Sequence, residues 1–277
     1  MKEFLNVSFK KVKGHDLFVD ISMPTEKKPP LIMWIHGGGW KDLNRTWNLA
    51  MPLLERGYAV ATVDYRYSAE GVLPTQMFDL KDALLFLRRH AEEYGYDGSK
   101  IAVSGDSAGG HLCALMGVSV GHREWETEAA DYSVQAVVDR CGPASLPLQF
   151  DGGVVEPDNA IDQLLGAPVT SKVGLARAAV ASPLTYIDGH EPPFLILHGT
   201  DDPVVPPRQA RLLRDALEKA GTPVMMYLIP GGVHGFQSKI VTDIIAEFLD
   251  YYMKAKTTVD TPALEKSHDR TIPVVKK

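Results

Sequence analysis

The sequence has few cysteines and no metal or nucleotide motif, which excludes several classes of protein. The two cysteines among its 277 residues, Cys113 and Cys141, do not make a disulfide framework. We interpret both as small buried hydrophobic residues. The patterns H-E-x-x-H, C-x-x-C and G-x-x-x-x-G-K are absent, so nothing supports metal or nucleotide chemistry. We therefore expect no cofactor and no bound metal.

The sequence also lacks a basic excess and a long apolar run. Its formal net charge is −6, so it has no electrostatic footprint for nucleic acid or for an anionic membrane. No run approaches about 18 consecutive apolar residues, and residues 1–6 lack the apolar region of a signal peptide. A cytoplasmic location is the default expectation, although a secreted protein whose signal has been removed would look the same. Hydrophobic residues make up 45% of the chain, enough for one domain with a large core.

Residues 105–109 read Gly-Asp-Ser-Ala-Gly, the G-x-S-x-G pattern of a nucleophile elbow. An apolar run at 101–103 precedes the pattern, and a helix-like stretch at 111–116 follows it. The glycines are needed because the serine sits on a sharp strand-to-helix turn, where larger side chains would collide. The pattern alone also fits an ordinary Gly-rich turn, but the flanking strand and helix favour the elbow. We predict that Ser107 is an exposed nucleophile.

A glycine loop supplies a second part of the same chemistry. The apolar run at 31–35 ends in His-Gly-Gly-Gly-Trp at 36–40. Backbone N–H groups can point at a substrate oxyanion only where no side chain blocks the approach. Three glycines alone would fit a flexible loop. Together with an elbow about seventy residues later, they match the HGGG oxyanion hole of lipases and esterases.

The acid and the histidine of a triad should follow the serine in that order. The apolar strand at 194–197 leads to Asp201 and Asp202, and the strand at 224–229 leads to His234 on a Gly-rich loop. Loops after parallel strands meet at one edge of the sheet, where such folds keep their sites. Both aspartates compete for the role of acid. We favour Asp202, because the H-G-x-x-D spacing of relatives places the acid there and Pro203 restrains its backbone.

The remaining histidines are interpreted as structural or solvated. His198 closes a strand and is expected to be hydrogen-bonded, His36 is expected to pin the glycine loop, and His111 lies on the helix behind Ser107. Five others lie in polar or loop contexts: His15, His90, His122, His190 and His268.

The pattern along the chain predicts an α/β fold with a mostly parallel, eight-stranded sheet and flanking helices. Alternating apolar and polar residues at 17–23 predict that 5–12 and 17–23 form an antiparallel hairpin at a sheet edge. Further strands are expected near 31–35, 58–64, 101–104, 134–138, 194–197 and 224–229, and helices at 47–56, 75–94, 107–118, 207–220 and 238–254. In the second helix Met77, Leu80, Leu84 and Leu87 step along one face.

The long connection at 144–186 and the C-terminus complete the expected domain plan. A connector of that length without structure is improbable, so we predict helices near 160–165 and 173–181 and a small insertion cap over the site. Its apolar residues are interspersed with acidic ones, unlike the broad apolar face of a lipase lid. A packed surface excursion is the alternative. Residues 1–254 are expected to form a single domain, and 255–277 a polar C-terminal tail.

Four segments together resemble the α/β-hydrolase superfamily, specifically carboxylesterases of the HGGG type: residues 36–40, 63–67, 105–110 and the Asp202/His234 pair. The resemblance runs from about residue 5 to residue 254. It implies that Ser107 attacks an ester carbonyl, His234 acts as base and then acid, and Asp202 orients the imidazole. It also implies oxyanion-hole N–H groups from Gly38, Gly39 and Ala108.

The narrower resemblance is to bacterial feruloyl and acetyl-xylan esterases, and more distantly to the hormone-sensitive-lipase family. The latter usually carries a substantial helical cap before its first strands, for which the N-terminus here is too short. We therefore expect hydrolysis of short-chain acyl esters, with acetyl or feruloyl groups on plant cell-wall saccharides as candidate substrates. A general short-chain carboxylesterase, a noncatalytic binding module and a peptidase remain alternatives, since fold does not fix function. An intact Ser107, Asp202 and His234 set argues against the binding module.

Overall fold

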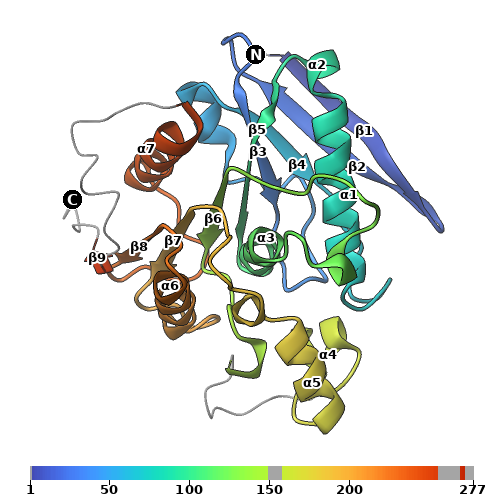
Figure 1. The fold of residues 1–277 in the computed structure, drawn as a ribbon, viewed down its shortest axis with the longest axis vertical. Coiled ribbons are helices and arrows are strands. Elements are labelled where there is room, and N and C mark those ends of the chain that lie inside the picture. Colours follow the sequence, from blue (N-terminus) through green and yellow to red (C-terminus); the bar gives the residue numbers. More distant parts are fainter. Residues whose placement is uncertain (1, 149–157, 255–268, 272–277) are drawn as a thin grey trace.

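One twisted sheet organises the chain (Figure 1). The computed structural model describes residues 2–148, 158–254 and 269–271. The strand order is β1-β2-β4-β3-β5-β6-β7-β8-β9. β1 pairs with β2 and β2 with β4 in antiparallel fashion, and all other neighbours are parallel. The strands are β1 Lys2–Val12, β2 His15–Met23, β3 Pro30–Ile35, β4 Ala59–Val63, β5 Asp97–Asp106, β6 Ala136–Arg140, β7 Phe194–Gly199, β8 Val224–Ile229 and β9 Asp269–Thr271. The predicted α/β fold and its edge hairpin are confirmed.

Helices cover both faces of the sheet and bury a core on each. β3, β4 and β6 are buried along their whole length, as expected for parallel strands covered on both sides. One core joins the sheet to α1 (Thr75–Arg89), α3 (Ala108–Val118) and α6 (Arg208–Ala220). The other joins it to the short 3₁₀ helix Met51–Arg56 and to α7 (Lys239–Lys254). No helix among the described residues is both long and apolar enough to cross a membrane.

Two predicted helices differ in extent from those observed. The segment 47–56 is helical only at Met51–Arg56, and as a 3₁₀ helix. Pro52 lies in its first turn. A proline has no N–H to donate to the carbonyl four residues earlier and its ring clashes with that carbonyl, so an α-helix that began at residue 47 would be broken there. The segment 75–94 is interrupted at His90 and divides into α1 and α2 (Ala91–Tyr94). The apolar stripe of α1 is buried as predicted.

The C-terminal segment contributes a ninth strand that the sequence did not predict. β9 lies at the sheet edge and pairs in parallel with β8 through residues 226–228. The rest of the predicted tail, 255–268 and 272–277, lies outside the described residues. The eight predicted strands are therefore all present, and β9 adds one more strand at the edge of the sheet.

The connection between β6 and β7 contains the two predicted helices, α4 (Ala160–Leu165) and α5 (Lys172–Val180). The side chain of Asn159 caps α4 by accepting hydrogen bonds from two backbone amides, and Ser171 caps α5 in the same way with one. Ile161, Leu164 and Ala178 join the main core. Figure 1 shows α4 and α5 together at one end of the molecule, beyond α3. Residues 149–157 of this connection are outside the described residues.

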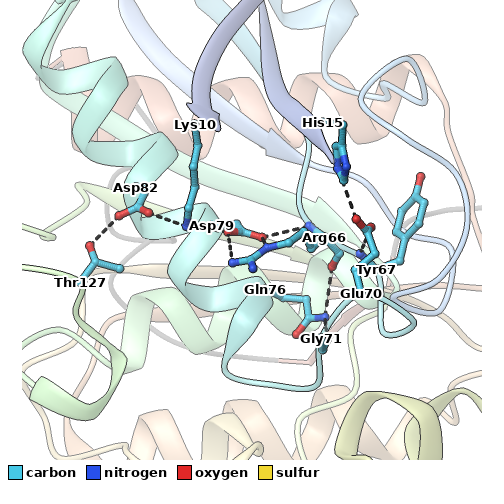
Figure 2. Close-up of polar contacts among 10 residues, drawn as sticks. All are labelled: Lys10, His15, Arg66, Tyr67, Glu70, Gly71, Gln76, Asp79, Asp82 and Thr127. Atoms are coloured by element: carbon cyan, nitrogen blue, oxygen red, sulfur yellow. Dashed lines mark hydrogen bonds and ion pairs between the residues drawn. The ribbon is translucent and has the colours of Figure 1, made fainter. Parts of the chain in front are cut away.

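A buried carboxylate ties the first strand, the segment after β4 and helix α1 together (Figure 2). Asp79 of α1 accepts two hydrogen bonds from the side chain of Arg66, at 2.8 Å from Nε and 2.7 Å from Nη2, and a third from the Arg66 amide at 3.0 Å. Lys10 of β1 contacts Asp79 Oδ1 at 2.7 Å and Asp82 Oδ2 at 2.6 Å. The side chain of Gln76 donates to the Arg66 carbonyl at 3.1 Å. These contacts, which we call the Asp79 network, fix the path of the chain immediately after β4.

Candidate active site

Ser107 stands at the turn between β5 and α3 in a backbone conformation that few residues adopt. Its φ is +54° and its ψ −118°, as required of a nucleophile at a strained strand-to-helix turn. A Cβ atom at Gly109 would lie 2.1 Å from the carbonyl oxygen of Ile35, so only glycine allows α3 to approach β3 this closely. The Ser107 amide donates to the Arg140 carbonyl at 2.8 Å. The sequence thus folds locally into the predicted elbow.

The structure brings Ser107, His234 and Asp202 into one hydrogen-bonded chain. Ser107 Oγ lies 2.8 Å from His234 Nε2. His234 Nδ1 lies 2.7 Å from Asp202 Oδ2. With Nδ1 protonated, the imidazole donates to the carboxylate and leaves Nε2 free to accept the serine proton. The three residues follow β5, β7 and β8, and all of these strands end at the same sheet edge.

Asp202, rather than Asp201, faces the histidine. The side chain of Asp202 is fully buried, and its Oδ1 accepts the amides of Val204 at 2.8 Å and Val205 at 2.9 Å. Asp201 is exposed, and its Oδ1 accepts a hydrogen bond from the Thr200 hydroxyl at 2.8 Å. The structure therefore places the aspartate favoured from the sequence beside His234.

The surroundings of Asp202 and His234 favour an ionised carboxylate next to a protonated imidazole. Burial would raise the pKa of Asp202, but hydrogen bonds from His198, His234 and the two valine amides hold that pKa well below its ordinary value. Burial lowers the pKa of His234, but its contacts with Asp202 and Cys141 outweigh that effect and raise it above the ordinary value. The carboxylate thus stays ionised and stabilises an imidazolium.

The glycine loop packs directly against the elbow. Gly38 has φ +94°, and a Cβ there would lie 2.0 Å from the Asp42 carbonyl oxygen, so this turn requires glycine. Lys41 and Asp42 donate their amides to the Gly38 carbonyl at 3.1 and 3.0 Å. Gly39 lines a pocket together with Ser107 and Ala108. Ala108 is the first residue of α3, where an amide has no acceptor within its own helix.

Tyr65 and His36 support the loop from below. Their rings stack with centroids 4.3 Å apart, and the Tyr65 hydroxyl donates to the carbonyls of His36 at 3.0 Å and Gly37 at 3.3 Å. Burial lowers the pKa of His36 to about 4, against a smaller opposing effect of its contact with the Gly37 carbonyl. Because Arg66 follows Tyr65, the Asp79 network holds this support in place. His36 thus has the structural position expected from the sequence.

His111 connects three parts of the site. Its Nδ1 accepts a hydrogen bond from Trp40 Nε1 at 3.2 Å, and its Nε2 lies 2.8 Å from the Ala181 carbonyl oxygen. An imidazole that accepts at one nitrogen and donates at the other is neutral, and burial lowers the pKa of His111 to about 4. The glycine loop, the elbow helix and the end of α5 therefore meet at one neutral ring.

A pocket of about 240 Å³ opens beside Ser107. Its walls come from the glycine loop, the elbow, the β6–β7 connection and the loop after β7. The lining residues are Gly39, Trp40, Ser107, Ala108, Pro143, Asn159, Ala160, Ile161, Val204 and Val205. Most of these side chains are small or apolar, so the pocket suits a short apolar group attached to the atom that Ser107 approaches.

Two residues beside the triad were not singled out as site residues from the sequence. Arg140 is buried, and its Nη2 donates to the Phe236 carbonyl and, at 2.9 Å, to Gln237 Oε1, which anchors the loop that carries His234. Cys141 has φ +48° and is buried, as predicted, but ligand atoms of Cys141, Asp202 and His234 lie within 4.8 Å of one another. The sequence offered one indication of a role at the site: both residues lie at the end of the β6 strand, at the sheet edge where such folds keep their sites.

Parallel strands that deliver an elbow serine, an acid and a histidine in that chain order characterise the α/β-hydrolases, and the chain has this fold. It belongs to the BD-FAE family, which matches residues 19–217. Among solved structures, a truncated carbohydrate esterase from gut microbiota is similar, with a TM-score of 0.81 and 28% identity over 92% of this chain and 97% of that one. Esterase Est2 of Thermogutta terrifontis with butyrate bound has a TM-score of 0.72 and 26% identity, covering 91% of this chain and 96% of that one.

Curated relatives carry esterase names. Esterase LipC of Mycobacterium tuberculosis is 31% identical over 223 residues, which cover 77% of this chain and 54% of the relative. The probable carboxylic ester hydrolase LipM of the same organism is 32% identical over 226 residues, or 75% of this chain and 49% of the relative. The chain thus spans about half the length of these curated relatives.

Proposed function

We propose that this chain is a serine carboxylic ester hydrolase with Ser107, His234 and Asp202 as its catalytic triad. The observation that carries the proposal is the 2.8 Å contact between Ser107 Oγ and His234 Nε2, with Nδ1 of the same ring 2.7 Å from Asp202 Oδ2. This is the geometry of a nucleophile activated by an oriented base. The esterase names of similar proteins support the same conclusion.

In the proposed reaction, Ser107 Oγ attacks the ester carbonyl carbon while its proton passes to His234 Nε2. The Asp202 carboxylate stabilises the imidazolium without accepting its proton. The resulting oxyanion receives hydrogen bonds from the backbone amides of Gly38, Gly39 and Ala108. Proton return from Nε2 to the leaving alkoxide releases the alcohol, and a water activated by the same nitrogen then hydrolyses the acyl-serine.

The substrate proposed here carries a short acyl group. The pocket beside Ser107 has a volume of about 240 Å³ and is closed on one side by Ala160 and Ile161 of α4. The segment 144–186 thereby acts as a small cap that sets the depth of the pocket, within the single domain 1–254. The bound butyrate of the similar esterase Est2 supports this size class.

The alcohol side of the ester is proposed to be a saccharide. An acetyl group fits the short acyl part, and the larger feruloyl group is the alternative acyl part. Two similar structures support this, the carbohydrate esterase from gut microbiota and a bifunctional GH43-CE protein of Bacteroides eggerthii, which has a TM-score of 0.80 and 26% identity over 90% of this chain and 38% of that one. A general short-chain carboxylesterase is the second candidate, favoured by the likeness to Est2.

A panel of esters tests the proposal. We expect kcat/KM for p-nitrophenyl acetate or butyrate to exceed that for the decanoate, because each extra methylene contributes at most about 0.8 kcal/mol and only where a wall receives it. Acetylated or feruloylated saccharides should also be hydrolysed. Short-chain activity without action on any saccharide ester would leave the general carboxylesterase. A maximum at long chains would contradict the assigned pocket.

Replacing two alanines by leucine, one at a time, tests where the acyl group binds. Ala160→Leu should reduce the rate with butyrate more than that with acetate, since Ala160 lines the pocket. Ala176→Leu is the matched control, because Ala176 lies on α5 and lines a different pocket. Equal effects of the two substitutions would show that the acyl group binds elsewhere.

A further inference from the structure

A sulfur, an imidazole and a carboxylate meet at the ends of three neighbouring strands. Cys141 follows β6, Asp202 follows β7 and His234 follows β8, and these strands are adjacent in the sheet. Among the residues that the structure describes, one ligand atom from each of the three lies within 4.8 Å of the others. The backbone amide of Cys141 donates to the Leu197 carbonyl at 2.9 Å, which ties this thiol-bearing residue to β7.

We propose that Cys141, Asp202 and His234 bind one Zn²⁺ or Cd²⁺ ion, and that this ion inhibits the enzyme. The inhibitory part rests on the function proposed above, whereas the binding part does not. Thiolate, imidazole and carboxylate are the ligands that Zn²⁺ takes in proteins, at about 2.0–2.3 Å, and soft thiolate favours such metals over Mg²⁺ or Ca²⁺. Around a tetrahedral ion with these bond lengths two ligand atoms lie about 3.3–3.8 Å apart. A pair of ligand atoms separated by the full 4.8 Å would therefore have to approach by roughly 1 Å.

The charges of the site suit a divalent cation. A thiolate and a carboxylate supply two negative charges, and a neutral imidazole adds none, so the complex with one ion is neutral. A neutral complex is favourable here because the side chain of Asp202 is fully buried and Cys141 is 1% exposed. On binding, the thiol of Cys141 gives its proton to solvent while the metal–sulfur bond forms. No oxidation or reduction takes place.

The choice of ring nitrogen explains why the ion would inhibit. His234 Nδ1 faces Asp202, whereas Nε2 faces Ser107, so an ion that also binds Asp202 takes Nδ1. A neutral imidazole with metal on Nδ1 carries its one proton on Nε2. That nitrogen then cannot accept the proton of Ser107. The ion therefore locks the base in the unproductive tautomer without touching the nucleophile.

The ion has to enter beside the histidine. The side chain of His234 is 22% exposed, in contrast to that of Asp202. Gly231 and Gly235 lie on the loop that carries the ring and have φ values of +66° and +76°, a backbone conformation that glycine adopts readily. In the proposed binding, the ion reaches Cys141 past the exposed edge of His234 by a small displacement of this loop.

Titration with Cd²⁺ tests the site without reference to hydrolysis. After treatment with a chelator, the full chain should show a thiolate-to-Cd²⁺ charge-transfer band in the ultraviolet, saturating at one ion per chain. Cys141→Ser should lose the band, and Cys113→Ser should keep it. Cys113 is the matched control because it is also buried but lies on α3, with its Sγ 3.1 Å from the Gly110 carbonyl oxygen. A band that is absent, or that survives Cys141→Ser, would overturn the proposal.

Inhibition by Zn²⁺ gives the second measurement. The inhibition constant, taken relative to each variant's own metal-free rate, should rise by at least about 10- to 100-fold in Cys141→Ser, since even an outer-shell partner contributes that much to metal affinity. Cys141→Ala serves if the serine variant does not fold. Ser107→Ala should still show the Cd²⁺ band. A protein that binds Cd²⁺ but hydrolyses no ester would refute the proposed function alone, and an active protein without the band would refute the metal site alone.

Discussion

Asp79 and Asp202 both have fully buried side chains, yet they lie in regions with different partners. Asp202 contacts two imidazoles, His234 at 2.7 Å and His198 at 3.4 Å. Asp79 contacts Arg66 and Lys10, both at 2.7 Å. Imidazole gains and loses a proton near neutral pH, whereas arginine and lysine stay charged there.

This difference separates the proposed catalytic carboxylate from a structural one. A buried carboxylate beside a permanent cation can only hold segments together, as the Asp79 network does for β1, α1 and the segment after β4. A buried carboxylate beside an imidazole can stabilise a proton that arrives during a reaction. Burial of a carboxylate therefore does not by itself indicate a catalytic site. The informative feature is whether its partner can gain and lose a proton near neutral pH.

The largest expected effect comes from the nucleophile. Ser107→Ala should lower ester turnover by about 10⁴- to 10⁶-fold, as deletions in serine triads do. The variant should still fold, because Ser107 Oγ is not part of the core. Turnover measured on the purified, folded variant checks this, and a rate near that of the unmodified protein would end the assignment of Ser107.

Substitution of the acid should come next. Asp202→Asn should lower kcat by roughly 10⁴-fold, since the imidazole then adopts the wrong tautomer. Asp201→Asn is the matched control and should have little effect, because Asp201 is exposed and contacts Thr200. Steady-state kinetics of both variants decide between them. A larger loss in Asp201→Asn would reverse the choice of acid.

Asp79→Asn should act on stability and not on chemistry. Removing this charge weakens hydrogen bonds to Arg66 and Lys10, which should reduce the free energy of unfolding by roughly 1.5–3 kcal/mol. A value near the lower end is expected because both cations are about one-fifth to one-quarter exposed and water screens them. Denaturant unfolding measures the loss. A fall in kcat per folded molecule that matched Asp202→Asn would remove the distinction between the two carboxylates.

The last prediction concerns the gradual change of rate with pH, which needs no substitution. His234 must be neutral to accept a proton, and its environment raises its pKa above the ordinary value. The reactive form therefore increases as pH rises, and kcat/KM should fall about tenfold per pH unit on the acidic side of that pKa. Asp202→Asn should move this limb to lower pH. A profile that stays flat down to about pH 4.5, where an ordinary histidine is charged, would contradict a histidine base.

Much of the candidate site was accessible from the sequence because strand ends can be located from apolar runs. Ser107, Asp202 and His234 each follow such a run, and parallel strands bring their ends to one edge. The H-G-x-x-D spacing already favoured Asp202 over Asp201, and the structure adds the physical basis, because the amides of Val204 and Val205 turn back onto Asp202 Oδ1. An aspartate followed by a proline is a local signal for such a turn.

The parts that the sequence did not predict depend on contacts between distant segments or on very short elements. The burial of Cys141 was predicted, but its neighbours Asp202 and His234 come from β7 and β8. β9 has three residues, Asp269–Thr271, too few for a periodic pattern. The helix expected at 47–56 is observed only at Met51–Arg56, because Pro52 cannot donate the hydrogen bond that a longer helix would need.

The neutral ring of His111 gives the protein a second and separate sensitivity to acid. Folding holds the pKa of His111 at about 4, below the unperturbed value of about 6.5, so the folded state binds fewer protons than the unfolded one between these values. Stability is therefore lost as pH falls through this window. A proton on Nδ1 would also remove the acceptor that holds Trp40 Nε1, releasing the glycine loop from α3. A falling pH would thus first protonate the proposed base, His234. At lower pH it would also protonate His111 and loosen the glycine loop that lines the pocket.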